Sequence, residues 1–189
     1  MRKWLCFALI AACTSVQAAP PPTADDDMGR FIAESALLTQ FDEVRTRVAD
    51  RTSELVMTAM GFLGVPYRRG GTDEAKGFDC SGFVRSMYER TVGFVLPRLA
   101  RDQAAATQPI DKKDLQPGDL VFFNTMKRAF SHVGIYVGEG KFIHSPKPGA
   151  QVRVEDMGQG YWQRRFDGAR RVLHLGPAEA QQQPARPQN

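Results

Sequence analysis

Two short apolar segments, residues 132–137 and 141–145, constrain the fold of this chain more than any other feature. Both alternate in the manner of β-strands, and they flank the loop Gly138-Glu139-Gly140, so they predict a β-hairpin. With a three-residue loop, Ile135 lies opposite Ile143 and the apolar side chains gather on one face. Because a slip of one residue would turn every side chain to the other face, this apolar pattern selects the register.

The register decides where two histidines of the hairpin lie. A three-residue loop pairs Val137 with Lys141 and Gly134 with His144. It then places His132 and His144 together on the face opposite the apolar one. A two-residue loop would split both sets, so the apolar pattern itself favours the register that brings the histidines together.

The rest of the chain orders helices before strands. Two amphipathic helices are expected, one over residues 31–50 and one from Ser53 to the Gly64–Pro66 turn. A third is expected to begin at Cys80, with Asp79 as its N-cap. Further strands are expected in three apolar segments: residues 120–123, 152–154 and 169–173. This order predicts an α+β fold, with N-terminal helices packed on an antiparallel sheet.

Residues 1–18 have the pattern of an export signal. A basic start precedes an apolar stretch that is too short to span a bilayer, and Val16-Gln17-Ala18 suits a signal peptidase. A second interpretation stays open, because Ile10-Ala11-Ala12-Cys13 resembles a bacterial lipobox. That signal would end before Cys13 and anchor the protein to the outer membrane through a lipid. Both interpretations predict a periplasmic protein.

The remaining chain is expected to hold one compact domain. Residues 19–52 are predicted to be a linker and a helix, and residues 53–175 the domain. Residues 176–189 are rich in Pro, Gln and Ala and are expected to be a disordered tail.

The charge of the exported protein is nearly balanced. Without the two basic residues of the signal, 25 Lys and Arg become 23 against 21 Asp and Glu. This near balance argues against nucleic-acid binding, and we expect a monomer.

Cys80 would be the only free thiol of the exported protein, because Cys6 and Cys13 lie in the signal. A lone thiol in an oxidising compartment has no internal disulfide partner, so a chemical role is expected. The start of a helix favours the thiolate and should lower the pKa of Cys80. His132 can act as the base and His144 can orient it, an order of parts typical of papain-like thiol hydrolases.

Less specific interpretations apply to each of these residues. A lone cysteine is most often a small buried hydrophobic residue, and a strand histidine is most often structural. Cys80, His132 and His144 could also hold zinc, but no paired Cys-x-x-Cys or His-x-x-x-His spacing supports a metal site, and no cofactor is expected. Tyr67 is a candidate oxyanion donor, beside the backbone N–H of Cys80, or only a packing residue. His174 is interpreted as structural.

Read together, the motifs resemble the NlpC family of papain-like cell-wall cysteine peptidases. The resemblance covers about Leu55 to Val172 and rests on motifs in the family's order. They are Pro66-Tyr67-Arg68-Arg69-Gly70-Gly71, Phe78-Asp79-Cys80-Ser81-Gly82-Phe83-Val84, Leu96-Pro97-Arg98, Gln103, Leu115 to Phe123, His132-Val133-Gly134-Ile135-Tyr136, Gly140 to Ser145, Tyr161-Trp162 and Arg170-Arg171-Val172.

The resemblance implies a papain-like fold with a nucleophilic cysteine at a helix N-terminus. It places the nucleophile at Cys80, the base at His132 and the orienting residue at His144. A second set of three residues falls where the family lines its substrate groove: Tyr67, Asp79 and Ser81. No metal or cofactor is implied.

The resemblance also implies an activity, the hydrolysis of amide bonds in peptidoglycan peptides. A D-Ala–diaminopimelate cross-link and a D-Glu–diaminopimelate stem bond both fit, and the single-domain layout slightly favours the cross-link. Two alternatives stay open: a catalytically silent wall-binding module, and a thiol acyltransferase or amidase that acts on a substrate outside the wall.

Overall fold

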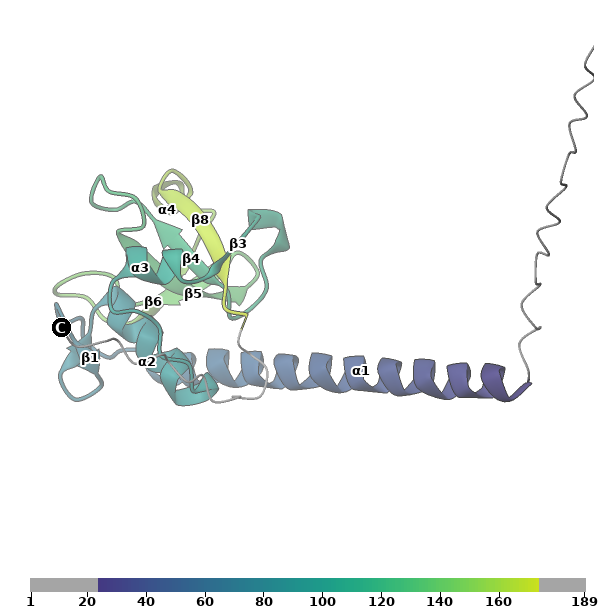
Figure 1. The fold of residues 1–189 in the computed structure, drawn as a ribbon. Helices are drawn as coiled ribbons and strands as arrows, with labels where there is room; N and C mark the ends of the chain where they lie inside the picture. The colour runs from purple at the N-terminus through teal and green to yellow at the C-terminus, as the bar shows by residue number, and fades with distance from the viewer. Residues whose placement is uncertain (1–23, 174–189) are drawn as a thin grey trace, which may run out of the picture. The chain divides into compact units, whose positions relative to one another are not determined.

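The computed structural model describes residues 24–173, and the side chains of residues 34–173 (Figure 1). The chain divides into two compact units, residues 1–40 and 41–189. Helix α1 (Ala24–Gly61) runs across the boundary between these units. His174, both ends of the chain and the expected export signal lie outside the described residues.

The single helix α1 corrects the prediction of two helices. The sequence between Arg30 and Met60 contains neither Gly nor Pro, so nothing interrupts the helix at Ser53. The helix also includes residues 25–27, which were expected in the linker. It ends at Gly61, before the predicted turn, and Gly64 follows with a positive φ of 86°.

Within the second unit, α1 contributes the buried residues Leu55 and Ala59 to the main core, while Phe41 and Val44 are exposed. No helix among the described residues is both long enough and apolar enough to cross a bilayer.

The centre of the second unit is a six-stranded antiparallel sheet with the order β3-β8-β4-β5-β6-β7. Its strands are β3 (Gln108–Ile110), β4 (Leu120–Phe123), β5 (His132–Gly138), β6 (Lys141–His144), β7 (Arg153–Asp156) and β8 (Phe166–Arg171). A two-stranded ribbon, β1 (Thr72–Asp73) and β2 (Gly77–Phe78), precedes the central helix. The predicted strands are all present, although β7 and β8 have shifted ends.

The β5–β6 hairpin keeps the predicted register at its core and changes it at its turn. Ile135 lies opposite Ile143 as predicted, but Gly138, and not Val137, is paired with Lys141. The turn has two residues, Glu139 and Gly140, whose φ angles are both positive (52° and 73°). Such a turn follows the twist of the strands, and the bulge before Gly138 absorbs the extra residue without turning the apolar face outward.

Two helices cover opposite faces of the sheet (Figure 1). Helix α2 (Cys80–Val92) begins at the predicted residue and packs on the face that carries Val133, Ile135 and Ile143. The short helix α4 (Gly160–Gln163) places Trp162 on the other face, with Phe123 and Phe142. The result is an α+β papain-like fold in which both faces of the central strands are buried.

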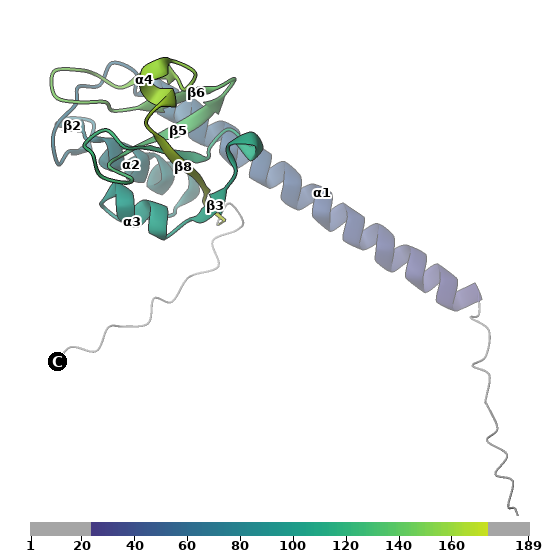
Figure 2. The same cartoon turned by 90° about the horizontal axis from the view of Figure 1, so that it is seen from above.

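Three short elements complete the unit at the edge of the sheet. Helix α3 (Ala100–Ala105) lies beside the edge strand β3, as Figure 2 shows from above. A single 3-10 turn, η1 (Lys112–Asp114), follows β3. These elements were not predicted, because α3 and η1 are too short to show a helical period and Gln108-Pro109-Ile110 in β3 has no apolar alternation.

Candidate active site

Asp79 holds the start of α2 and therefore the position of Cys80. Its Oδ1 accepts a hydrogen bond from the backbone N–H of Gly82 at 2.8 Å, which confirms the predicted N-cap. Its Oδ2 accepts a second bond from the N–H of Gly70 at 2.9 Å. Asp79 therefore links the first turn of the helix to the loop at Gly70, and this link holds Cys80, the first residue of the helix, in place.

Arg98 ties Asp79 to Ser81 across Cys80. Its Nη1 donates to Asp79 Oδ1 at 3.0 Å and to Ser81 Oγ at 2.9 Å, and its Nη2 also pairs with Asp79. The structure therefore places Asp79 and Ser81, two of the three predicted groove residues, next to Cys80 as parts of one polar cluster. Arg98 was not predicted as a site residue, although the Leu96-Pro97-Arg98 motif contained it.

Buried neighbours hold the polar cluster of Asp79, Ser81 and Arg98 in place. Gln103 is fully buried, and its Nε2 donates to the carbonyls of Ser81 (3.0 Å) and Pro97 (2.9 Å). A Cβ at Gly82 would lie 2.1 Å from the carbonyl oxygen of Gly71, so only glycine allows the helix to approach this loop. The segment that carries Arg98 is thereby held against the first turn of α2.

The structure brings His132 and His144 together, as the hairpin register predicted. His132 begins β5 and His144 ends β6, and His132 Nε2 lies 2.7 Å from His144 Nδ1. Their exposed fractions are 4% and 0%. Trp162 stacks on His132 at 5.6 Å and meets His144 edge-on at 5.1 Å, which keeps water from the pair.

Two charged residues on β7 extend this pair. His144 Nε2 lies 3.1 Å from Glu155 Oε2, and Arg153 Nη2 lies 2.6 Å from Glu155 Oε1. Neither residue was predicted to belong to the site. Their spacing of two places them on the same face of β7, but only the pairing of β6 with β7 shows that this face meets His144.

Burial, and not the helix start, has the largest effect on the pKa of the Cys80 thiol. Desolvation and the charge of Asp79 raise the pKa of Cys80 to about 11, against the weaker effect of hydrogen bonds that include the N–H of Val133. The predicted lowering of this pKa is therefore wrong. Burial, with the nearby His144, lowers the pKa of His132 to about 3. The resting pair is accordingly a neutral thiol and a neutral imidazole.

Tyr67 lies at the same site. Burial raises its pKa, and Cys80 and Asp79 add to the effect through their charges. Its backbone N–H donates to the carbonyl of Ala150 at 2.8 Å, which holds the backbone at this half-buried residue. This location suits a donor to the substrate or to a developing oxyanion.

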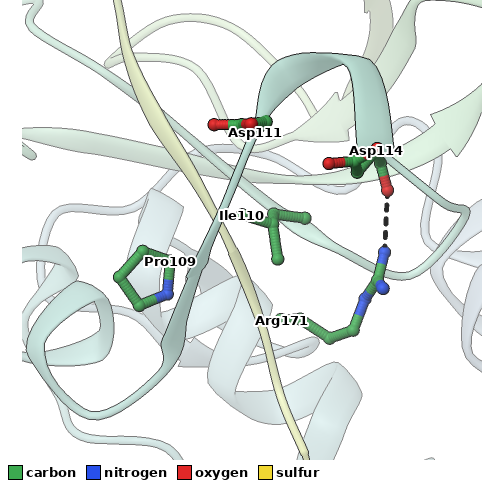
Figure 3. A pocket seen from close by; sticks show the side chains of 5 residues that line it. All are labelled: Pro109, Ile110, Asp111, Asp114 and Arg171. Atoms are coloured by element: carbon green, nitrogen blue, oxygen red, sulfur yellow. Dashed lines mark hydrogen bonds between the residues drawn. The ribbon is translucent and has the colours of Figure 1, made fainter.

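A separate hollow of about 480 Å³ lies at the β3–β8 edge of the sheet (Figure 3). Its lining residues come from β3, η1, β8 and the residue between β3 and η1: Pro109, Ile110, Asp111, Asp114 and Arg171. Arg171 is already bonded to Asp119 and to the carbonyl of Asp114 (2.9 Å), and the hollow contains neither thiol nor imidazole. In residues 24–173 no group of three or more His, Cys, Asp or Glu could hold a metal ion.

Comparisons with known proteins point to one family. The sequence model of the NlpC/P60 family matches residues 64–171. The chain is 39% identical over 145 residues to murein DD-endopeptidase MepH of Escherichia coli K12, an alignment that covers 75% of the chain and 54% of that relative. It is 38% identical over 147 residues to γ-D-glutamyl-L-lysine dipeptidyl-peptidase of Bacillus subtilis 168, covering 76% and 47%.

A solved structure of the same family is also similar to this chain. The crystal structure of an NlpC/P60 family protein from Bacillus cereus superposes with a TM-score of 0.60 at 36% identity, covering 66% of this chain and 40% of that one. The chain thus spans about half the length of the curated relatives to which it is similar.

Proposed function

Because the chain belongs to the NlpC/P60 family, we propose that it is a cysteine endopeptidase that cleaves amide bonds in peptidoglycan peptides. The observation that carries the proposal is the constellation around Cys80. The Cys80 thiol, at the start of α2, lies beside β5, whose first residue His132 forms a buried pair with His144 at the end of β6. Nucleophile, base and orienting residue are the parts that thiol hydrolysis of an amide requires.

The proposed reaction begins from the neutral thiol. Because His132 Nε2 is engaged by His144, the nitrogen left for the thiol is Nδ1. Nδ1 takes the proton of Cys80 as the sulfur attacks the substrate carbonyl. The tetrahedral intermediate then expels the amine, which takes the proton from His132 and leaves a thioester on Cys80. Water, deprotonated by His132, hydrolyses the thioester and restores the thiol.

The remaining predicted residues are assigned to the substrate. Tyr67 and the backbone N–H of Cys80 would stabilise the oxyanion of the intermediate. Asp79 and Ser81, tied together by Arg98, would line the groove that holds the peptide. These hydrogen bonds support a rigid groove wall, because the side chains are fixed before the substrate arrives.

We assign the D-Ala–diaminopimelate cross-link as the first substrate. The similarity to a relative named as a murein DD-endopeptidase supports this bond. The relative named for a γ-D-glutamyl bond makes the stem peptide the second candidate. Both substrates occur in the wall, so we place the activity in the periplasm. The expected signal over residues 1–18, with its lipobox alternative at Cys13, supports export.

The test uses defined muropeptides and the pair wild type and Cys80→Ala. Wild type is expected to convert a cross-linked dimer to monomers, followed by mass spectrometry, while the variant shows no product and an unchanged melting temperature. Cleavage of a monomeric stem peptide alone would move the assignment to the stem bond. Full activity in Cys80→Ala, or wall binding without cleavage by wild type, would overturn the proposed enzyme.

A further inference from the structure

We propose that Glu155, held by Arg153, is a positioning residue that fixes the ring tautomers of both His144 and His132. The inference rests on the proposed function only in assigning the base to His132. It concerns a residue outside the predicted set of three, on a strand next to the hairpin.

The first step is the charge of Glu155. Its Oε1 lies 2.6 Å from Arg153 Nη2, and the side chain is 18% exposed. Burial raises its pKa, but the hydrogen bond with His144 and the charge of Arg153 outweigh burial and lower the pKa to about 2. Glu155 is therefore a carboxylate at neutral pH, and a carboxylate can only accept hydrogen bonds.

The second step is the tautomer of His144. Its Nε2 lies 3.1 Å from Glu155 Oε2, so this nitrogen must carry the hydrogen and donate it. Burial lowers the pKa of His144 and keeps the ring neutral. A neutral ring holds one hydrogen, so Nδ1 of His144 is an unprotonated acceptor.

The third step is the tautomer of His132, which the tautomer of His144 determines. His132 Nε2 lies 2.7 Å from His144 Nδ1, and an acceptor there requires that His132 donate from Nε2. His132 is also neutral, because burial lowers its pKa to about 3. Its Nδ1 is then free of hydrogen, which is the state that a base facing Cys80 needs. The carboxylate on β7 thus determines which nitrogen of His132 accepts the proton.

This chain of donors predicts an unusual result for Glu155→Gln. Arg153 only donates, so it holds the amide oxygen of the new Gln and turns the amide NH₂ toward His144. Both ring tautomers should then reverse, and Nδ1 of His132 should carry a hydrogen. A tautomer-reversing substitution can reduce kcat by roughly 10²-fold to 10⁴-fold with little change in KM.

The matched control is the double variant Arg153→Met/Glu155→Gln. Without Arg153 the amide is free to rotate, and its oxygen can accept from His144 as the carboxylate does. We expect kcat to recover at least about tenfold relative to Glu155→Gln, on the same scale of estimate. A merely structural role for Glu155 predicts the opposite, because the double variant loses one more interaction.

The experiment combines ring ¹⁵N NMR with kinetics on the full chain. In wild type we expect the hydrogen on Nε2 of both rings, and in Glu155→Gln on Nδ1 of both rings. In the double variant we expect the hydrogen on Nε2 of both rings again, and kcat should recover with it. Unchanged tautomers in Glu155→Gln, or no recovery in the double variant, would overturn the inference. The NMR result decides the tautomers even if wild type cleaves no muropeptide, so failure of the proposed function would be seen separately.

Discussion

Asp79 acts on its neighbour Cys80 in two opposite ways. As the N-cap it holds the helix start that presents the thiol, and as a carboxylate it disfavours the thiolate. Burial adds to the second effect, and the hydrogen bond from Val133 only partly offsets it. At the scale of single residues, the position of the Cys80 thiol and its ionisation are therefore set by different forces.

This conflict predicts how the free protein reacts with iodoacetamide. Since the thiolate fraction grows about tenfold per pH unit below the pKa, the alkylation rate of Cys80 should rise throughout pH 6 to 9. Asp79→Asn keeps a capping side chain and removes the charge, so it should react faster at each pH. Rates measured by mass spectrometry that level off below pH 7 would instead indicate a thiolate–imidazolium pair.

At the scale of elements, the β5–β6 hairpin depends on a close approach at Gly134. A Cβ there would lie 2.6 Å from Phe142 Cδ2, 2.9 Å from the carbonyl oxygen of Ile143 and 3.1 Å from His144 Cβ. The absence of a side chain at Gly134 allows the Phe142 ring and the Cβ of His144 to lie close to β5. The glycine in the His132-Val133-Gly134 motif therefore has a packing function.

Gly134→Ala is expected to displace His144 and lower both stability and activity. Overpacking of a filled site typically costs about 1–3 kcal/mol, and loss of the 2.7 Å contact between the rings should reduce kcat. Gly61→Ala is the matched control, because nothing lies within 4 Å of its Cβ. Urea unfolding and muropeptide kinetics measure both effects, and equal values for the two variants would contradict the packing argument.

The sequence predicted these elements unevenly, for physical reasons. The start of α2 and the core register of the hairpin followed from capping and alternation, which are local properties. The continuous α1 was missed because Ser53 resembles a cap yet is tolerated inside a helix. The two-residue turn was missed because a bulge lets a different loop length keep the same apolar face.

At the scale of the whole molecule, the buried site makes the fold sensitive to acid. Burial lowers the pKa of His132 from 6.5 to about 3, and that of His144 falls as well. Below about pH 6.5 the unfolded chain therefore binds more protons at these residues than the folded protein does. Glu155, with a pKa lowered from 4.5 to about 2, acts in the same direction at lower pH.

The melting temperature is accordingly expected to fall as the pH decreases from 7 to 4. His132→Asn lacks one of the buried titrating groups, so its melting temperature should depend less steeply on pH over this range. Differential scanning calorimetry at each pH provides the comparison. The idea fails if the two proteins lose stability in parallel, because His132 would then bind protons equally in both states.

The sequence by itself determined the α+β class, the place of Cys80 at a helix start and the pairing of His132 with His144. These follow from capping, alternation and order along the chain, which are properties of neighbouring residues. Only the tertiary structure placed Arg98 across Asp79 and Ser81, and Glu155 with Arg153 behind His144. It also decided that Cys80 rests as a neutral thiol, since exclusion of water depends on what the rest of the chain packs against the site.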